Sequence, residues 1–182
     1  MKRAFVTPPE LPAAALAELK AWLGITTAHD DAGLAALLRA AMEMCEAFTG
    51  LLPLEASCEE VLPATSAWQA LATRPVHAIT AVDDLPADGP RFALPLASHA
   101  IDITADGTGM VRITGPVAAG RVVVRFTAGL EGEWQDLPQA LRHGIIRLAA
   151  HQHRARDDDR VSPLPPASVA ALWRPWRRLR LA

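Results

Sequence analysis

The sequence predicts an α+β protein, mainly α, built as a helical bundle with an inserted small antiparallel β-module and a C-terminal helical arm. Near both ends of the chain, apolar residues recur at the three-and-four spacing of one helical face. In the middle they form short runs separated by proline and glycine, which favours strands and turns. We therefore expect a body over residues 1–156 and, over 157–182, a proline-rich linker followed by a basic helix.

Two helices are expected before the β-module. The first, at about 10–23, stops at Gly24. Its apolar face is formed by Leu16, Leu19, Trp22 and Leu23. The second, at about 30–49, starts at Asp30 and Asp31, whose carboxylates suit the free N–H groups of a first turn. This helix is rich in alanine, so several of its faces can pack closely against neighbours in the same chain or in another.

The β-module is expected at about 53–129, where prolines and glycines are frequent. Four short apolar runs predict strands at 76–82, 100–104, 110–114 and 121–127. Asp106 and Gly107 lie between the second and third runs and suit a tight hairpin turn. The runs 100–104 and 110–114 alternate as half-exposed strands do, so the module is expected to be antiparallel.

A third helix is expected at about 136–156, with Asp136 as its N-cap and Pro138 in its first turn. Helical spacing predicts that one side of this helix is formed by Leu137, Leu141, Ile145, Leu148 and Gln152. The acidic run 157–159 and the proline-rich run 162–166 break the helix and form a stiff linker.

The last helix is expected at about 167–181, kinked or ended by Pro175. It places two tryptophans among four arginines, and these residue types dominate the hot spots of protein interfaces. The residues predicted to dock onto a partner are Leu172, Trp173, Arg174, Trp176, Arg177, Arg178 and Arg180.

Three interpretations of this basic segment compete. It is a protein-docking arm, a nucleic-acid binder that contacts phosphates, or an amphipathic helix folded back with its tryptophans in the core. Residues 1–135 carry 9 Lys/Arg and 16 Asp/Glu, a net charge of −7, whereas residues 136–182 carry 9 and 4, a net of +5. The acidic body would oppose DNA elsewhere on the molecule, so the charge asymmetry favours docking onto an acidic partner.

Composition excludes several classes of protein. The two cysteines, Cys45 and Cys58, are too few for a disulfide framework or a metal cage, which indicates a reducing, cytoplasmic setting. No apolar stretch approaches the roughly 20 residues of a membrane span, so we expect no membrane association. The net charge of −2 gives no sign of a nucleic-acid binder.

The side chains that could carry chemistry do not assemble into a site. His151 and His153 are two residues apart, so they point away from each other on a helix, and His143 finds no further ligand to complete a metal shell. The acidic run 157–159 lacks the spacing of a calcium loop. We find no nucleophile elbow and no glycine-rich phosphate loop. We therefore expect no catalytic residue, no metal and no cofactor, unless an apolar pocket gathers titratable groups.

Five motifs occur in an order that points to a known family. They are Thr7-Pro8-Pro9 with Leu16 to Leu23, Asp30-Asp31 running to Thr49-Gly50, Arg74-Pro75-Val76 with Ile79 to Val82, Val122 to Gly129, and Leu137-Pro138 running to His153-Arg154-Ala155-Arg156. In this order the sequence resembles the head–tail connector, or adaptor, proteins of long-tailed phages, which also occur in prophages and gene transfer agents. The chain departs from the family where His153 replaces the usual tyrosine.

The resemblance implies a non-enzymatic virion protein that forms a ring of about a dozen copies beneath the portal protein. It implies that the C-terminal segment engages the portal and that the opposite side receives a stopper or tail-terminator protein. DNA would pass through the channel without sequence-specific contact. Such a protein lies at the head–tail interface of a phage-like particle that assembles in the bacterial cytoplasm.

A ring subunit needs two different lateral surfaces, and the second and third helices are the candidates. The residues proposed for this subunit interface are Leu34, Leu37, Ala41, Arg147, His151 and Arg154. The alternative is that these helical faces fill the core of the subunit itself. A rival function is a DNA-binding accessory protein that uses the Arg/Trp tail, and a steep salt dependence of binding would distinguish it.

Overall fold

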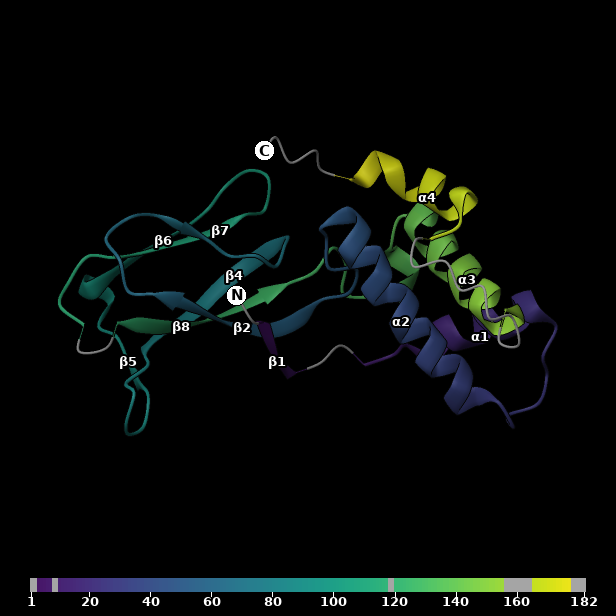
Figure 1. Ribbon diagram of the computed structural model, residues 1–182, viewed down its shortest axis with the longest axis horizontal. Helices are drawn as coiled ribbons and strands as arrows, with labels where there is room; N and C mark the ends of the chain where they lie inside the picture. Colours follow the sequence, from purple (N-terminus) through teal and green to yellow (C-terminus); the bar gives the residue numbers. More distant parts are fainter. Residues whose placement is uncertain (1–2, 8–9, 118–119, 156–164, 178–182) are drawn as a thin grey trace. The chain divides into compact units, whose positions relative to one another are not determined.

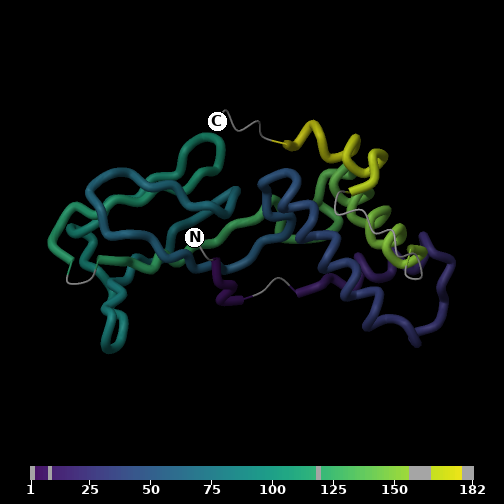
Figure 2. Tube along the Cα trace, viewed as in Figure 1, coloured from purple at the N-terminus to yellow at the C-terminus, as the bar shows by residue number. Residues whose placement is uncertain are grey.

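The computed structural model describes residues 3–7, 10–117, 120–155 and 165–177 (Figure 1). The chain divides into two compact units. The first, which we call the β unit, contains residues 3–7 and most of 55–130. The second, the helical unit, contains 10–54 and the described residues from 131 onward. The tube in Figure 2 shows by its colours that the β unit combines the N-terminal strand with the middle of the chain.

A five-stranded antiparallel sheet forms most of the β unit. Its strands lie in the order β1 (Arg3–Thr7), β2 (Ala56–Pro63), β8 (Arg121–Ala128), β4 (Val76–Asp84) and β5 (Phe92–Ala93). The central strand β8 pairs with β2 on one side and β4 on the other. Its residues Val122, Val124 and Phe126 are fully buried.

A smaller antiparallel sheet completes the unit, in the order β3 (Gln69–Ala70), β7 (Gly109–Ile113) and β6 (His99–Ile103). A 3₁₀ turn, η1 (Leu96–Ser98), leads into β6. The hairpin predicted at Gly107 is confirmed: this residue has a φ of +75° and donates its N–H to the Thr104 carbonyl at 2.8 Å. The packing there is close, because a Cβ at Gly107 would lie 2.6 Å from the Cβ of Pro75.

The α+β class is confirmed, and the four predicted strands correspond to β4, β6, β7 and β8. The description as mainly α with a small insert is not established, because the strands build a compact unit of their own. The strands β1 and β2 and the two-residue strands β3 and β5 were not predicted. In β2 the inward positions are Ala56, Cys58, Glu60 and Leu62, so a charged residue interrupts the apolar alternation on which strand prediction depends.

Glu60 is fully buried and ties β2 to the loop before β4. Its carboxylate accepts hydrogen bonds from the backbone N–H of Ala72 (2.8 Å), from the backbone N–H of Thr73 (2.9 Å) and from the Thr73 hydroxyl (2.7 Å). Buried carboxylates are tolerated when such donors replace water. The side chain that hides β2 in the sequence therefore fixes the loop 72–73 in the structure.

The helical unit is built around α3 (Gln139–Arg154). The helices α1 (Ala13–Leu23), α2 (Asp31–Thr49) and α4 (Ala167–Trp173) all contact it, and 3₁₀ turns occur at η2 (Trp134–Asp136) and η3 (Arg174–Trp176). Leu141, Ile145 and Leu148 are buried on the side that the helical spacing predicted.

The ends of the helices differ in detail from the prediction. Asp136 is not the N-cap of α3: it ends the turn η2, and Pro138 occupies the cap position instead. Gly24 ends α1 with a φ of +73°, as predicted. Pro175 ends the last α-helix as expected, because α4 stops at Trp173 and Pro175 lies in η3. The acidic run 157–159 and the end of the predicted last helix lie outside the described residues.

Trp173 holds α4 against the rest of the helical unit. Its side chain is fully buried, its indole N–H donates to the Leu141 carbonyl at 3.3 Å, and its ring lies 5.9 Å from the ring of Phe48. The contact requires a glycine at position 144, because a Cβ there would lie 2.2 Å from the Trp173 Nε1. Gly144 on α3, which has no side chain, thus leaves room for the Trp173 ring of α4.

We predict that Glu60→Ala lowers the free energy of unfolding by about 3 kcal/mol, because two backbone N–H groups lose their acceptor inside the protein. Chemical denaturation followed by circular dichroism measures this loss. Asp88→Ala is the matched control, since Asp88 is an exposed acidic residue of the same unit. A loss no larger than that of the control would contradict the role given to Glu60.

We predict that Gly144→Ala lowers the free energy of unfolding by about 1–3 kcal/mol, because the new methyl group displaces the Trp173 ring. Gly33→Ala in α2 is the control, since a Cβ there meets no atom within 4 Å. Alanine is the better helix former by about 1 kcal/mol, so this second variant should be stabilised. Opposite signs in thermal denaturation support the packing, and equal shifts argue against it.

Candidate assembly surfaces

The structure sorts the predicted docking residues of the C-terminal segment into buried and accessible ones. Trp173 lies in the core of the helical unit, so its side chain is not available to a partner. Leu172 and Trp176 are half-buried, while Arg174 and Arg177 are exposed. For Trp173 the structure therefore matches the alternative of a helix folded back on its own chain.

The accessible cations of this segment are Arg174 and Arg177, which we call the basic surface; the Arg177 N–H donates to the Arg174 carbonyl at 3.1 Å. The guanidinium carbon of Arg177 lies 5.5 Å from the ring centroid of Phe48 on α2, so the charged group is steadied by an aromatic face. Arg178 and Arg180 lie outside the described residues. A partner that docks here would meet the two described arginines.

The residues predicted for the subunit interface also divide. Leu34 and Ala41 are buried in the helical unit and belong to its own core, as do Leu38, Leu141 and Ile145. Leu37 and Arg147 are half-buried, whereas His151 and Arg154 are exposed. An alanine-rich helix face predicts close packing, but packing within a chain and packing between chains give the same pattern. The predicted interface therefore combined core residues with accessible ones.

A cleft of about 340 Å³ opens between the start of α2 and the end of α3. Its lining residues are His29, Asp30, Gly33, Leu34, Leu37, Gln152 and His153. Leucines supply an apolar wall, and the histidines, the aspartate and the glutamine supply a polar one. The Oε1 atom of Gln152 is buried and has no hydrogen-bond partner among the described residues.

Exposed large apolar side chains form a third set, which the sequence analysis did not assign to any interface. Among the described residues, most of them belong to the β unit: Phe5, Val6, Val61, Trp68, Phe92, Leu96, Ile101 and Ile103. In the helical unit Trp22 is 46% exposed, although the spacing had placed it on the apolar face of the first helix. Exposed apolar side chains mark protein-contact surfaces where they form a contiguous patch.

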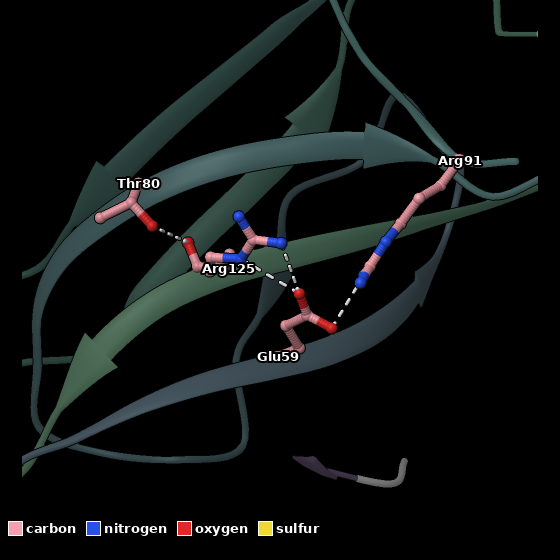
Figure 3. Close-up of polar contacts among 4 residues, drawn as sticks. All are labelled: Glu59, Thr80, Arg91 and Arg125. Carbon is pink, nitrogen blue, oxygen red and sulfur yellow. Dashed lines mark hydrogen bonds and ion pairs between the residues drawn. The ribbon is translucent and has the colours of Figure 1, made fainter. Parts of the chain in front are cut away.

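Three charged side chains form a network on the five-stranded sheet (Figure 3). Arg125 on β8 donates from Nε (3.1 Å) and Nη2 (2.9 Å) to one oxygen of Glu59 on β2, and Arg91 donates to the other oxygen at 2.8 Å. Thr80 on β4 donates its hydroxyl to the Arg125 carbonyl at 3.1 Å. The Glu59 carboxylate thus joins β2 to its neighbour β8 and to Arg91, the residue that precedes β5.

The network shifts the titration of its carboxylate. Burial by itself would raise the pKa of Glu59, but the hydrogen bonds and positive charges of Arg91 and Arg125 outweigh it and hold that pKa below its ordinary value of 4.5. Both guanidinium groups are engaged by the same acid, so this cluster stabilises the sheet rather than offering free cations to a ligand.

The described residues contain no group of three or more His, Cys, Asp or Glu side chains that could hold a metal ion. Both cysteines are buried, and they are not joined in a disulfide. Burial raises the pKa of Cys45 to about 12; the nearby Glu46 charge adds to the rise and the hydrogen bond with Thr49 opposes it. The Cys45 thiol is therefore unreactive at neutral pH. Within the part of the chain that the structure describes, no helix is long and apolar enough to span a membrane.

We predict that the wild-type protein loses more stability in acid than its Glu59→Gln variant. The folded pKa of Glu59 lies below the unfolded value, so its contribution is present above about pH 4.5 and is lost as the pH falls through the folded pKa. Denaturation midpoints between about pH 6 and pH 3 test this, with Asp88→Asn as the control. Parallel pH profiles for wild type and Glu59→Gln would rule out the network as a source of acid sensitivity.

Comparison with known proteins gives whole-chain matches among solved structures. The chain is similar to a chain in the neck of an empty gene transfer agent particle, computed with C6 symmetry, with a TM-score of 0.81 and 26% identity. It is also similar to chains in the neck of the native particle, computed with C12 symmetry (0.77, 28%), and in the native virion (0.76, 28%). Each match covers 100% of this chain and 98% of the other.

No family model matches the sequence, and a search of curated proteins gives no match. The structural matches nevertheless include both units and run from one end of the chain to the other. They support a protein of the phage neck, or connector, type.

Proposed function

We propose that this chain is a structural head–tail connector subunit that forms a ring beneath the portal of a phage-like particle and joins the capsid to the tail. The likeness of the whole chain to neck chains of a gene transfer agent particle carries this proposal. Agreement over both units argues that the two chains share a role, because a shared single unit would support only a shared fold.

A ring of about twelve copies is the proposed assembly. The similar neck structures were computed with C6 and C12 symmetry, which supports a rotational ring. Rotational rings use heterologous contacts, in which one surface of a subunit meets a different surface of the next. The exposed residues His151 and Arg154 and the half-buried Leu37 and Arg147 remain candidates for this contact, whereas Leu34 and Ala41 are occupied in the subunit core.

The charge distribution suggests which side of the proposed subunit faces the portal and which faces the tail. The basic surface at Arg174 and Arg177 docks onto the portal, and the opposite side receives a stopper or tail-terminator protein. Residues 1–135 carry the net charge of −7. A channel lined by part of this acidic surface would repel the DNA backbone, so that DNA slides through without sequence-specific contact.

We predict that Arg174→Glu with Arg177→Glu weakens binding to the portal about tenfold or more, because both exposed cations are reversed. Reversal is preferable to removal of residues 167–182, which would also remove the buried Trp173. Portal pull-down and electron microscopy of particles measure the effect, with Arg39→Glu on α2 as the control. Normal portal binding and normal yields of tailed particles for the double variant would refute the docking role.

The rival function is DNA binding through the same arginines. The salt dependence of binding distinguishes it from portal docking. Phosphate contacts release counterions, so DNA affinity falls steeply as salt rises. With Trp173 buried, the described segment offers two exposed arginines for such contacts. Binding to the portal that persists at salt concentrations that abolish DNA binding supports the connector, and the reverse order supports the accessory protein.

A further inference from the structure

The cleft beside α2 has the size and the chemistry of a socket for one large side chain. Its volume of about 340 Å³ is at the lower end of small-molecule sites, which run from about 300 to 1,000 Å³. Leu37 gives it an apolar wall, and the edge of the core residue Leu34 lies at its base. Gly33 keeps it open, because no atom lies within 4 Å of the place where a Cβ would be.

The same cleft offers a hydrogen-bond acceptor that the described chain leaves unused. The Oε1 of Gln152 is buried and has no partner among the described residues. Buried polar atoms are almost always paired in a finished structure, so this acceptor indicates a donor that arrives from outside the described chain. A side chain that fits here would be large and apolar and would carry one N–H or O–H group.

Trp22 is a side chain of this type, and it stands on the surface of the same unit. It is 46% exposed, whereas Trp134 and Trp173 are buried and donate their indole N–H groups to Glu18 and to the Leu141 carbonyl. The edge-on contact of its ring with His143, at 5.2 Å between centroids, fixes the direction in which the indole stands. Tryptophan is among the residues most enriched at the centre of protein interfaces.

Trp22 and the cleft lie at separate places on the helical unit. His143, which holds Trp22, and Gln152, which lines the cleft, are nine residues apart on α3, or about 13 Å along the helix axis. Two different surfaces on each subunit are what a closed ring of identical copies requires. A second copy of this chain is therefore the occupant that the geometry favours.

We propose that Trp22 of one copy inserts into the Gly33–Leu37–Gln152 cleft of the next copy, with its indole N–H donating to the Gln152 Oε1. This inference rests on the proposed ring and names the contact that closes it. The polar residues at the cleft, His29, Asp30 and His153, would then surround the buried indole as a hydrated rim.

Cross-linking between two singly substituted full-length chains tests the contact. Ala21→Cys is placed beside Trp22 in one chain, and Ala32→Cys beside Gly33 in the other, so a joined pair always comes from two molecules. Both alanines are exposed. The native thiols stay silent because both are buried. The control partner is Ala40→Cys, which is exposed on the same helix about 10 Å beyond Gly33.

With a short bis-maleimide, the Ala21→Cys and Ala32→Cys pair should join about tenfold faster than the Ala21→Cys and Ala40→Cys pair. Adding Trp22→Ala, or blocking the cleft with Gly33→Leu, should reduce this rate about tenfold, whereas Trp68→Ala, which removes an exposed tryptophan of the β unit, should not. Melting curves establish that each variant is folded.

Equal rates for the two pairs, a rate unaffected by Trp22→Ala, or no selective cross-link with or without portal present would overturn the contact. Failure here is distinct from failure of the proposed function. A chain found in the neck of particles, but with no selective cross-link, loses the Trp22 contact and keeps the connector role. A selective cross-link in a chain that is absent from the neck gives the reverse result.

Discussion

The packing of Trp173 over Gly144 holds the C-terminal helix α4 against α3. The Trp173 ring of α4 is buried against α3. The segment that the sequence predicts as a free arm is therefore packed on the helical unit. Arg174 and Arg177 then follow a helix that is packed in place. An interface held on a rigid element loses less conformational entropy on binding than a flexible tail does. In the proposed ring, this pre-organisation would lower the entropic cost of each contact.

The β unit depends on two neighbouring glutamates that point to opposite faces of β2. Glu60 faces inward and receives three hydrogen bonds from the loop at Ala72 and Thr73. Glu59 faces the other side and joins Arg91 and Arg125. The period of two along a strand assigns these roles, because adjacent side chains emerge on opposite faces. One strand thereby fixes a buried loop and braces the sheet surface at the same time.

Helical periodicity allowed most of the helical unit to be predicted, because Leu141, Ile145 and Leu148 follow a period that only one helix face satisfies. The strands were harder. Glu60 breaks the alternation in β2, and β1 is a short strand with a mostly exposed pattern. The predicted interface combined core residues with accessible ones. Leucine and alanine on a helix give the same pattern whether the partner is in the same chain or in another. The cleft could not be predicted at all, because it depends on how two helix ends meet.

The proposed function places this chain in the neck of a phage-like particle, as a ring adjoining the portal. Cryo-electron microscopy of purified particles from cells that produce the chain tests this most directly. The proposed function predicts a ring of density at the head–tail junction into which both units fit, with the Arg174–Arg177 surface facing the portal. Particles with a complete neck that lacks this chain, or density for the chain elsewhere in the particle, would contradict it.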